Sequence, residues 1–261
     1  MKLNTYTLIT GASGGIGYDL ALLAAAEGRN LVLAARSASK LDQVAAEIRK
    51  NNKSDVIVIA VDLSDTAGVQ TLIKEISGRN IQVDILINNA GFGDFGDFAK
   101  ADLAKNLEMI RLNISALTQL THTFLQGMLK AGSGRIMNVA STAAFMPGPG
   151  MAVYYASKAY VLSFSEALTR ELKGTGVTVT TLCPGPTDTG FALSAGLGKS
   201  LLHRILPAAT SAQVAHAGYK AMMKGKAIEI PGFMNKLSSV SPRFIPRSMV
   251  RNMIYGIHKN H

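Results

Sequence analysis

The sequence predicts an α/β fold in which helices cover both faces of a doubly wound parallel sheet of about seven strands. Two observations support this prediction. Seven short apolar runs rich in Val and Ile recur along the 261 residues, and most lack polar alternation. Strands that are buried on both faces of a parallel sheet have this pattern. Helical stretches separate the runs, and such alternation packs as one sheet between two helical layers.

The elements follow one another along the whole chain. The predicted strands are Tyr6–Thr10, Asn30–Ala35, Asp55–Val61, Val83–Asn88, Gly134–Ala140, Val177–Cys183 and Ala227–Ile230. The predicted helices are Ile16–Glu27, Ser39–Lys50, Asp65–Ile76, Asp102–Lys130, Ala152–Lys173 and Ser211–Lys224. Neither an internal repeat nor a Pro- and Ser-rich linker interrupts them, so residues 1–261 are expected to form one domain.

Composition excludes several classes of protein. Charged residues make up 17% and apolar residues 48% of the chain, which excludes a disordered polyelectrolyte. Cys183 is the only cysteine, so a disulfide framework is excluded. The five histidines form no ligand cluster, and no metal site is expected. Neither a signal peptide nor an apolar run of about 20 residues is seen, so a cytoplasmic location is expected.

Positive charge is concentrated at the C-terminus. The net charge is +10, and residues 220–261 hold eight Lys or Arg and one acid, which leaves only +3 for the first 219 residues. A short helix is predicted from Pro246, a residue suited to a first helical position. Its apolar residues form one stripe, made of Met249, Val250, Met253, Ile254 and Ile257.

A glycine-rich turn joins the first predicted strand to the first helix. It contains Gly11, Ser13, Gly15, Ile16 and Gly17. Glycines let the backbone approach a ligand closely, and the helix N-terminus presents free N–H groups to a pyrophosphate. In this strand–turn–helix setting the turn predicts a dinucleotide site in a Rossmann fold.

The end of the second strand indicates which dinucleotide binds. An NAD site normally places an acid about 20 residues on, to hold the ribose 2′-hydroxyl. Residues 30–40 contain no acid, and Arg36 stands near that position, followed by Ser37. A guanidinium suits a 2′-phosphate, so NADP(H) is the predicted cofactor.

A second group of residues points to proton transfer. Tyr154 and Lys158 are four residues apart at the start of a predicted helix and share one face. A nearby ammonium favours a phenolate and is expected to lower the pKa of Tyr154. Ser141 follows the strand ending at Ala140, at the carboxyl edge where ligands of such sheets bind.

With these residues the sequence resembles the short-chain dehydrogenase/reductases over about residues 5–232. The motifs that carry the resemblance are Thr10–Gly17, Asp62, Asn88-Asn89-Ala90-Gly91, Asn113, Ser141, Tyr154-x-x-x-Lys158, Pro184-Gly185 and Thr189. The resemblance implies a catalytic tetrad of Asn113, Ser141, Tyr154 and Lys158. Besides Tyr154, Lys158 and the residues of the glycine turn, it implies cofactor contacts from Arg36, Ser37, Asp62, Leu63, Asn88, Ala90, Gly91, Pro184, Gly185, Thr187 and Thr189. It also implies a homodimer or homotetramer.

The substrate is predicted to be apolar. Residues 94–98 and 145–154, which frame the pocket, contain no Lys or Arg to hold a carboxylate or phosphate. Residues 187–206 are expected to form a substrate lid. We therefore expect hydride transfer between the nicotinamide and an apolar ketone or aldehyde, or the corresponding alcohol. A 3-oxoacyl-thioester reductase and a non-catalytic NADP(H)-sensing module are the alternatives.

The basic tail, residues 233–261, has three interpretations. It docks on its own domain or on a second subunit, it contacts an anionic membrane peripherally, or it attracts an acidic protein partner. Nucleic acid is not an expected partner, because no recognition motif accompanies the charge.

Overall fold

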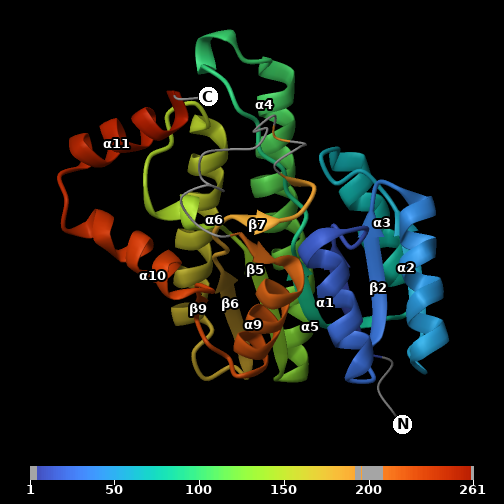
Figure 1. Cartoon of the computed structure of the whole chain (residues 1–261). Coiled ribbons are helices and arrows are strands. Elements are labelled where there is room, and N and C mark those ends of the chain that lie inside the picture. The colour runs from blue at the N-terminus through green and yellow to red at the C-terminus, as the bar shows by residue number, and fades with distance from the viewer. Residues whose placement is uncertain (1–4, 192–194, 196–207, 260–261) are drawn as a thin grey trace.

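The computed structural model describes residues 5–191, residue 195 and residues 208–259, and its centre is a parallel sheet (Figure 1). Its seven strands lie in the order β3-β2-β1-β4-β5-β6-β9, and every neighbouring pair is parallel. The strands are β1 Thr5–Thr10, β2 Asn30–Ala35, β3 Val56–Ala60, β4 Gln82–Asn88, β5 Gly134–Val139, β6 Val177–Leu182 and β9 Ile228–Glu229. The predicted fold is confirmed.

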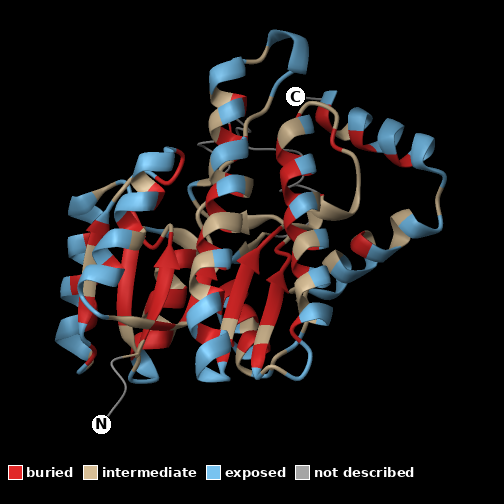
Figure 2. Ribbon diagram, turned by 180° about the vertical axis from the view of Figure 1, so that it is seen from behind, coloured by how far each residue is buried: buried red, intermediate tan, exposed pale blue. Residues whose placement is uncertain are grey.

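Helices cover both faces of the sheet. The bounds of those that pack on it are α1 Gly15–Ala26, α2 Ala38–Asn51, α3 Thr66–Gly78, α5 Leu117–Ala131, α6 Ala152–Glu171 and α9 Ser211–Met223. One large core cluster joins the sheet to α1, α2 and α9, and a second joins it to α3, α5 and the end of α6. Most residues of β1, β2, β4, β5 and β6 are buried (Figure 2), which explains their unbroken apolar sequences.

The chain reverses its direction of travel across the sheet between β1 and β4. In such sheets ligands bind outside the carboxyl ends of the strands at this reversal point. The glycine-rich turn follows β1, and Asn89, Ala90 and Gly91 follow β4. Topology therefore brings the two motifs together at one edge.

One predicted helix is divided into three segments. The stretch predicted as Asp102–Lys130 forms α4 Leu103–Ile110, a π-helical segment Arg111–Ala116, and α5. A π segment adds a residue to the helical turn and often occurs at functional sites. Apolar periodicity does not distinguish it from an α-helix, so the sequence predicted one continuous helix.

The elements after Pro184-Gly185 differ further from the predicted ones. The last strand has only two residues, and α10 Phe233–Val240 was not predicted. A short 3-10 turn, η4 Ser241–Arg243, leads from α10 toward α11. At eight residues, α10 is shorter than the window over which periodicity identifies a helix.

The predicted C-terminal helix is present as α11 Arg247–Lys259, directly after Pro246. Only part of its apolar stripe faces the body: Val250 and Ile254 are buried, while Met249 and Met253 are exposed. None of the described helices is both long and apolar enough to span a bilayer.

The predicted lid lies largely outside the described residues. Its first part contains β7 Thr187–Asp188, which pairs in parallel with β8 Ala209–Thr210. Phe191 and Ala195 are also described, whereas residues 192–194 and 196–207 are not.

Candidate active site

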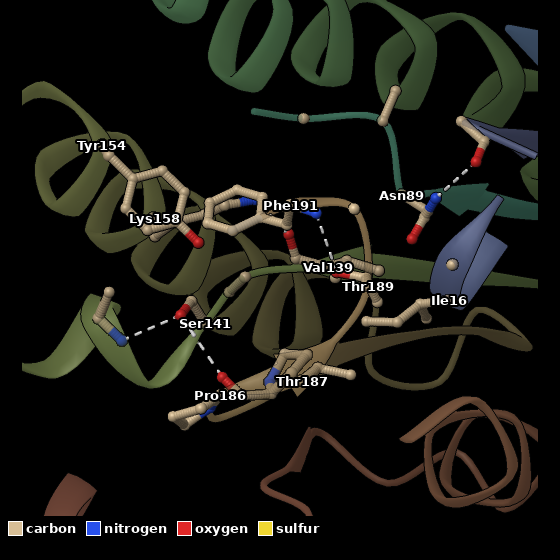
Figure 3. Close-up of a pocket in the computed structure, with 18 of the residues that line it drawn as sticks. Ile16, Asn89, Val139, Ser141, Tyr154, Lys158, Pro186, Thr187, Thr189 and Phe191 are labelled. Atoms are coloured by element: carbon tan, nitrogen blue, oxygen red, sulfur yellow. Dashed lines mark hydrogen bonds between the residues drawn. The ribbon is translucent and has the colours of Figure 1, made fainter. Parts of the chain in front are cut away.

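A cavity of about 540 Å³ opens at the carboxyl edge of the sheet, between the glycine turn and α6 (Figure 3). It brings together most of the residues predicted to bind cofactor or substrate. Those that line it are Gly11, Ser13, Gly15, Ile16, Ala90, Gly91, Ser141, Tyr154, Lys158, Pro184, Gly185, Thr187 and Thr189. Residues more than 170 positions apart in the chain thus line the same cavity.

The glycine turn leaves room for a ligand at the start of α1. Gly11 and Gly15 have φ of 66° and 54°, a conformation that side-chain-bearing residues rarely adopt. A Cβ on Gly17 would lie 2.3 Å from the carbonyl oxygen of Gly11, so the helix packs closely against the turn. In the part of the chain that the structure describes, no side chain caps the helix N-terminus, which leaves its N–H groups for a bound anion.

Asn89 and Thr10 hold this turn against the end of β4. The backbone nitrogens of Asn89 and Ala90 each donate to Thr10 Oγ1 at 3.0 Å. Asn89 Nδ2 donates to the carbonyl oxygens of Thr10 and Gly11, at 3.0 and 3.2 Å. These bonds fix the two halves of the cavity floor relative to each other.

Tyr154 points into the cavity from the first turn of α6 (Figure 3). The Phe191 ring lies 5.2 Å from its ring, centroid to centroid. Burial raises the pKa of Tyr154 to about 12, although a hydrogen bond with Ser141 acts in the opposite direction. Ser141 Oγ also accepts from the backbone nitrogen of Ala143 at 3.1 Å, which orients the hydroxyl.

Lys158 lies one turn after Tyr154 on the same helix face. Its Nζ donates to the carbonyl oxygen of Val139 at 2.9 Å and lies 5.8 Å from the centre of the Tyr154 ring. Burial lowers the pKa of Lys158 to about 8. The expected lowering of the pKa of Tyr154 by this ammonium is not seen in the protein alone, because desolvation of the phenol dominates.

Asn113 lies in the π-helical segment, behind the cavity wall. Its Nδ2 donates to the carbonyl oxygen of Phe92 and to Ser157 Oγ, each at 3.0 Å. A Cβ on Gly91 would lie 3.0 Å from Asn113 Oδ1 and 3.3 Å from Lys158 Nζ. Gly91 therefore separates Asn113 from Lys158 with the least possible bulk.

Other predicted residues do not line this cavity. Besides Asn113, they are Gly17, Arg36, Ser37, Asp62, Leu63 and Asn88. Asn88 is buried and donates from Nδ2 to Thr121 Oγ1 and Asn138 Oδ1, both at 2.9 Å. Asn88 thus ties β4 to α5 and β5.

Arg36 and Asp62 lie beyond the end of the cavity. The Arg36 side chain is mostly exposed, with Nη1 3.7 Å from Glu108 Oε1. Asp62 Oδ1 accepts from Ser64 Oγ at 2.7 Å. Burial acts to raise the pKa of Asp62, but the hydrogen bonds from Ser64 and the charge of Arg36 outweigh it, and the pKa is lowered.

Sequence reasoning missed Lys40 and Met151, which both line the cavity. Lys40 lies in the first turn of α2, where its backbone nitrogen donates to Ser37 Oγ at 3.4 Å. The signal was a second cation four residues after Arg36, in the first turn of the helix that follows β2. Met151 lies in a loop, where periodicity gives no signal.

Among the described residues, no group of His, Cys, Asp or Glu is placed to hold a metal ion.

Comparison with known proteins tests the resemblance seen in the sequence. The family model described as short chain dehydrogenase matches residues 5–199. Among curated relatives, the ketoacyl reductase HetN of Nostoc sp. is 34% identical over 224 residues, which covers 85% of this chain and 76% of that protein.

Solved structures share the whole architecture. A short-chain dehydrogenase from Sphingobium yanoikuyae, in complex with NADPH, matches with a TM-score of 0.79 at 32% identity, over 92% of this chain and 90% of that one. The bulky-bulky ketone specific alcohol dehydrogenase from Comamonas testosteroni matches with a TM-score of 0.78 at 29% identity, over 94% of each chain. The family model, the relatives and the geometry of the cavity agree: this chain belongs to the short-chain dehydrogenase/reductase family.

Proposed function

We propose that this oxidoreductase uses NADP(H) to transfer hydride between the nicotinamide and an apolar ketone or aldehyde, or the corresponding alcohol. The observation that carries the proposal is the meeting of Tyr154, Ser141 and Lys158 in one cavity with the glycine turn. Proton transfer and dinucleotide binding thus share one space.

The residues of the cavity fit a dinucleotide. Gly11 and Gly15 have positive φ, and a Cβ on Gly91 would crowd both Asn113 and Lys158. We assign the pyrophosphate to the N-terminus of α1, and the nicotinamide end to Lys158, Thr187 and Thr189. When bound, the nicotinamide supplies or accepts the hydride.

The side chains supply the proton chemistry. With its pKa raised to about 12, Tyr154 is protonated at neutral pH and can donate its proton to a carbonyl oxygen. Ser141 is placed to orient the same oxygen. Lys158 places an ammonium beside the phenol, which stabilises the phenolate left after proton donation. Asn113 braces the turn after β4 through its bonds to Phe92.

An apolar substrate suits the wall around Tyr154. The buried cluster there contains Met151 and Tyr155, with Phe92 and Phe191 packed against it. Of the cations among the described lining residues, Lys40 lies beside the glycine turn and Lys158 donates to Val139. Neither is placed to hold an anionic substrate group. The ketone-specific relative from Comamonas testosteroni supports the same substrate class.

The preference for NADP(H) rests on the cations near the start of α2. Arg36 follows β2 where an NAD-binding relative would carry an acid, and Lys40, in the first turn of α2, lines the cavity. The 2′-phosphate would draw Arg36 away from its 3.7 Å contact with Glu108. The relative from Sphingobium yanoikuyae, solved with NADPH, supports this preference.

A 3-oxoacyl-thioester reductase is the second candidate, and the ketoacyl reductase relative favours it. Its substrate presents the same carbonyl to Tyr154 and differs in the group that extends beyond the cavity. A non-catalytic NADP(H) sensor is disfavoured, because all four residues of the tetrad are present.

We also propose a cytoplasmic homodimer or homotetramer that associates through α5 and α6, where Leu129 and Tyr160 are exposed.

The decisive experiment is a reduction assay monitored by cofactor absorbance. Purified protein is offered aromatic and long-chain ketones and aldehydes, acetoacetyl thioesters, and a sugar phosphate, each with NADPH and with NADH. We expect the highest kcat/KM for apolar ketones or aldehydes with NADPH. Preference for the thioester would favour the second candidate, and absence of turnover across the panel would contradict both.

A further inference from the structure

The polarity of α10 is the reverse of that of an ordinary surface helix. Its apolar residues Phe233, Met234, Leu237 and Val240 fall at i, i+1, i+4 and i+7, and all four are exposed, with Phe233 at 79%. The opposite side carries Asn235, Ser238 and Ser239. Ser239 is buried, and Asn235 Nδ2 donates to the carbonyl oxygen of Pro231 at 2.7 Å. The helix therefore turns its polar side to the body and its apolar side outward.

The apolar surface continues past the end of α10. Phe244, between α10 and α11, is 83% exposed, and Met249 and Met253 are exposed on α11. Both helices lie at the edge of the molecule opposite α2 and α3 (Figures 1 and 2). We call residues 233–259 the tail surface. So many large apolar side chains exposed on one segment indicate an interaction site rather than scattered surface residues.

The inner side of α11 is firmly attached to the body. His258 is buried, with Nδ1 2.5 Å from the carbonyl oxygen of Pro149. Its ring meets those of Phe95 and Tyr155 edge to face, at 5.8 and 5.9 Å between centroids. Val250 and Ile254 are buried on the same side. Since the helix is already docked through this face, its exposed methionines are left for another contact.

The tail surface carries positive charge and no carboxylate side chain. Its five cations are Lys236, Arg243, Arg247, Arg251 and Lys259, and residues 233–259 contain neither Asp nor Glu. All five are exposed, and none forms an ion pair with another described residue. Lys259 Nζ lies 5.8 Å from the centre of the Tyr255 ring, and the other four cations are exposed to an anionic partner.

These observations favour lipid over a second copy of this chain as that partner. A two-fold contact with a second copy would bring the same five cations face to face, and such like-charge contacts are unfavourable. Helices that combine cations with Phe or Leu bind the boundary between lipid headgroups and acyl chains. We propose that the tail surface binds an anionic membrane, with Phe233 and Phe244 inserted and the cations on lipid headgroups.

The position of α11 links this surface to the cavity. The His258 ring contacts Tyr155, which lines the cavity. It also contacts Phe95. The backbone nitrogen of Phe95 donates to the carbonyl oxygen of Ala195 at 3.1 Å. If the proposed function holds, an apolar substrate dissolved in the bilayer would enter near these residues. Membrane binding itself does not depend on turnover, so the two proposals fail separately.

The first test is sedimentation of the full chain with vesicles of two compositions. One contains phosphatidylcholine alone, and the other contains phosphatidylcholine with phosphatidylglycerol. We expect the protein to sediment with the anionic vesicles at low salt, and high salt to weaken this binding strongly. It should not sediment with phosphatidylcholine alone.

Variants separate the two contributions. Arg247→Gln with Arg251→Gln removes two cations and should weaken binding on the order of thirtyfold, or about fivefold for each cation. Lys50→Gln with Lys74→Gln, on α2 and α3, makes the same charge change elsewhere and should leave binding unchanged. Phe233→Ser with Phe244→Ser should abolish binding, whereas Leu103→Ser with Leu107→Ser on α4 should not. Circular dichroism and reductase activity without vesicles should match the parent protein in all four variants.

Three results would overturn the proposal. One is the absence of binding to anionic vesicles. Another is equal, salt-insensitive binding to both vesicle types. The third is a change of oligomeric state in the Phe233→Ser, Phe244→Ser variant, seen by light scattering without a loss of vesicle binding, which would identify the surface as a contact between copies of this chain.

Discussion

At the scale of single residues, the chemistry depends on which of two adjacent tyrosines acts. Both Tyr154 and Tyr155 are buried and line the cavity, and it is over the Tyr154 ring that the Lys158 ammonium lies, 5.8 Å from its centre. Tyr154→Phe should lower kcat/KM for carbonyl reduction by about 10²–10⁴-fold, the range for loss of a general acid. NADPH binding, followed by the fluorescence of the cofactor, should be retained. Tyr155→Phe is the matched control and should keep most of the activity; the opposite ranking would assign the acid to Tyr155.

The lowered pKa of Lys158 predicts that kcat/KM depends on pH. Burial lowers its pKa to about 8, so the ammonium is lost as the pH rises past that value, where an exposed lysine keeps its proton. Tyr154, with a pKa raised to about 12, stays protonated over this range. For carbonyl reduction, kcat/KM for NADPH should therefore be constant below about pH 8 and fall above it. A profile that stays flat to pH ~10 would contradict this role for the ammonium.

Cofactor choice is also decided by single side chains. Arg36→Ala or Lys40→Ala should each reduce the preference for NADPH over NADH by about 10- to 100-fold, the value of a charge-assisted hydrogen bond. Lys53→Ala, at an exposed cation after α2, serves as the control and should leave the ratio unchanged. Steady-state kcat/KM with both cofactors measures the effect. An unchanged ratio in Arg36→Ala would exclude Arg36 from the 2′-phosphate site.

At the scale of elements, α5 contains a glycine that its helix does not need. Gly127 is exposed within α5, and a Cβ placed there meets no atom within 4 Å. Gly127→Ala should raise the free energy of unfolding by about 0.5–1 kcal/mol, from helix propensity alone. Gly134→Ala is the contrasting control, because its Cβ would lie 2.5 Å from Met128 and should destabilise the protein. Urea unfolding measures both, and loss of stability in Gly127→Ala would show a contact on this face.

The π-helical segment shows how an element determines the site. Asn113 bonds Phe92 and Ser157 from this segment, and those bonds brace the turn after β4. The sequence identified Asn113 through its resemblance to a family but predicted a continuous helix around it. The segment packs against α3 and α6 and bonds the turn after β4, and all three lie far from it in the chain.

At the scale of the whole molecule, one sheet carries the two large core clusters, so the chain should unfold as one unit. Calorimetry should give a single transition for the protein alone. NADPH at about 100 times its dissociation constant should add about 2.7 kcal/mol of stability and raise Tm by roughly 5–10 °C. Adenosine, which lacks the phosphates, is the control and should raise Tm little. Two separate transitions would contradict the single-domain prediction.

The sequence by itself determined the succession of strands and helices along the chain and the chemistry of the turns between them. Val- and Ile-rich runs specify buried strands, glycines specify the turn after β1, and the spacing of Tyr154 and Lys158 places both on one helix face. These signals are local, because each depends on residues within a few positions of one another.

Tertiary structure alone decided which side chains share a space. Lys40 lines the cavity because α2 starts beside the glycine turn, and His258 meets Phe95 and Tyr155 across more than 100 residues of chain. The sequence likewise did not predict that the apolar side of α10 faces outward. Periodicity identifies an apolar and a polar side of a helix, but it does not say which of them faces the body. That choice depends on packing between distant elements, which no local pattern encodes.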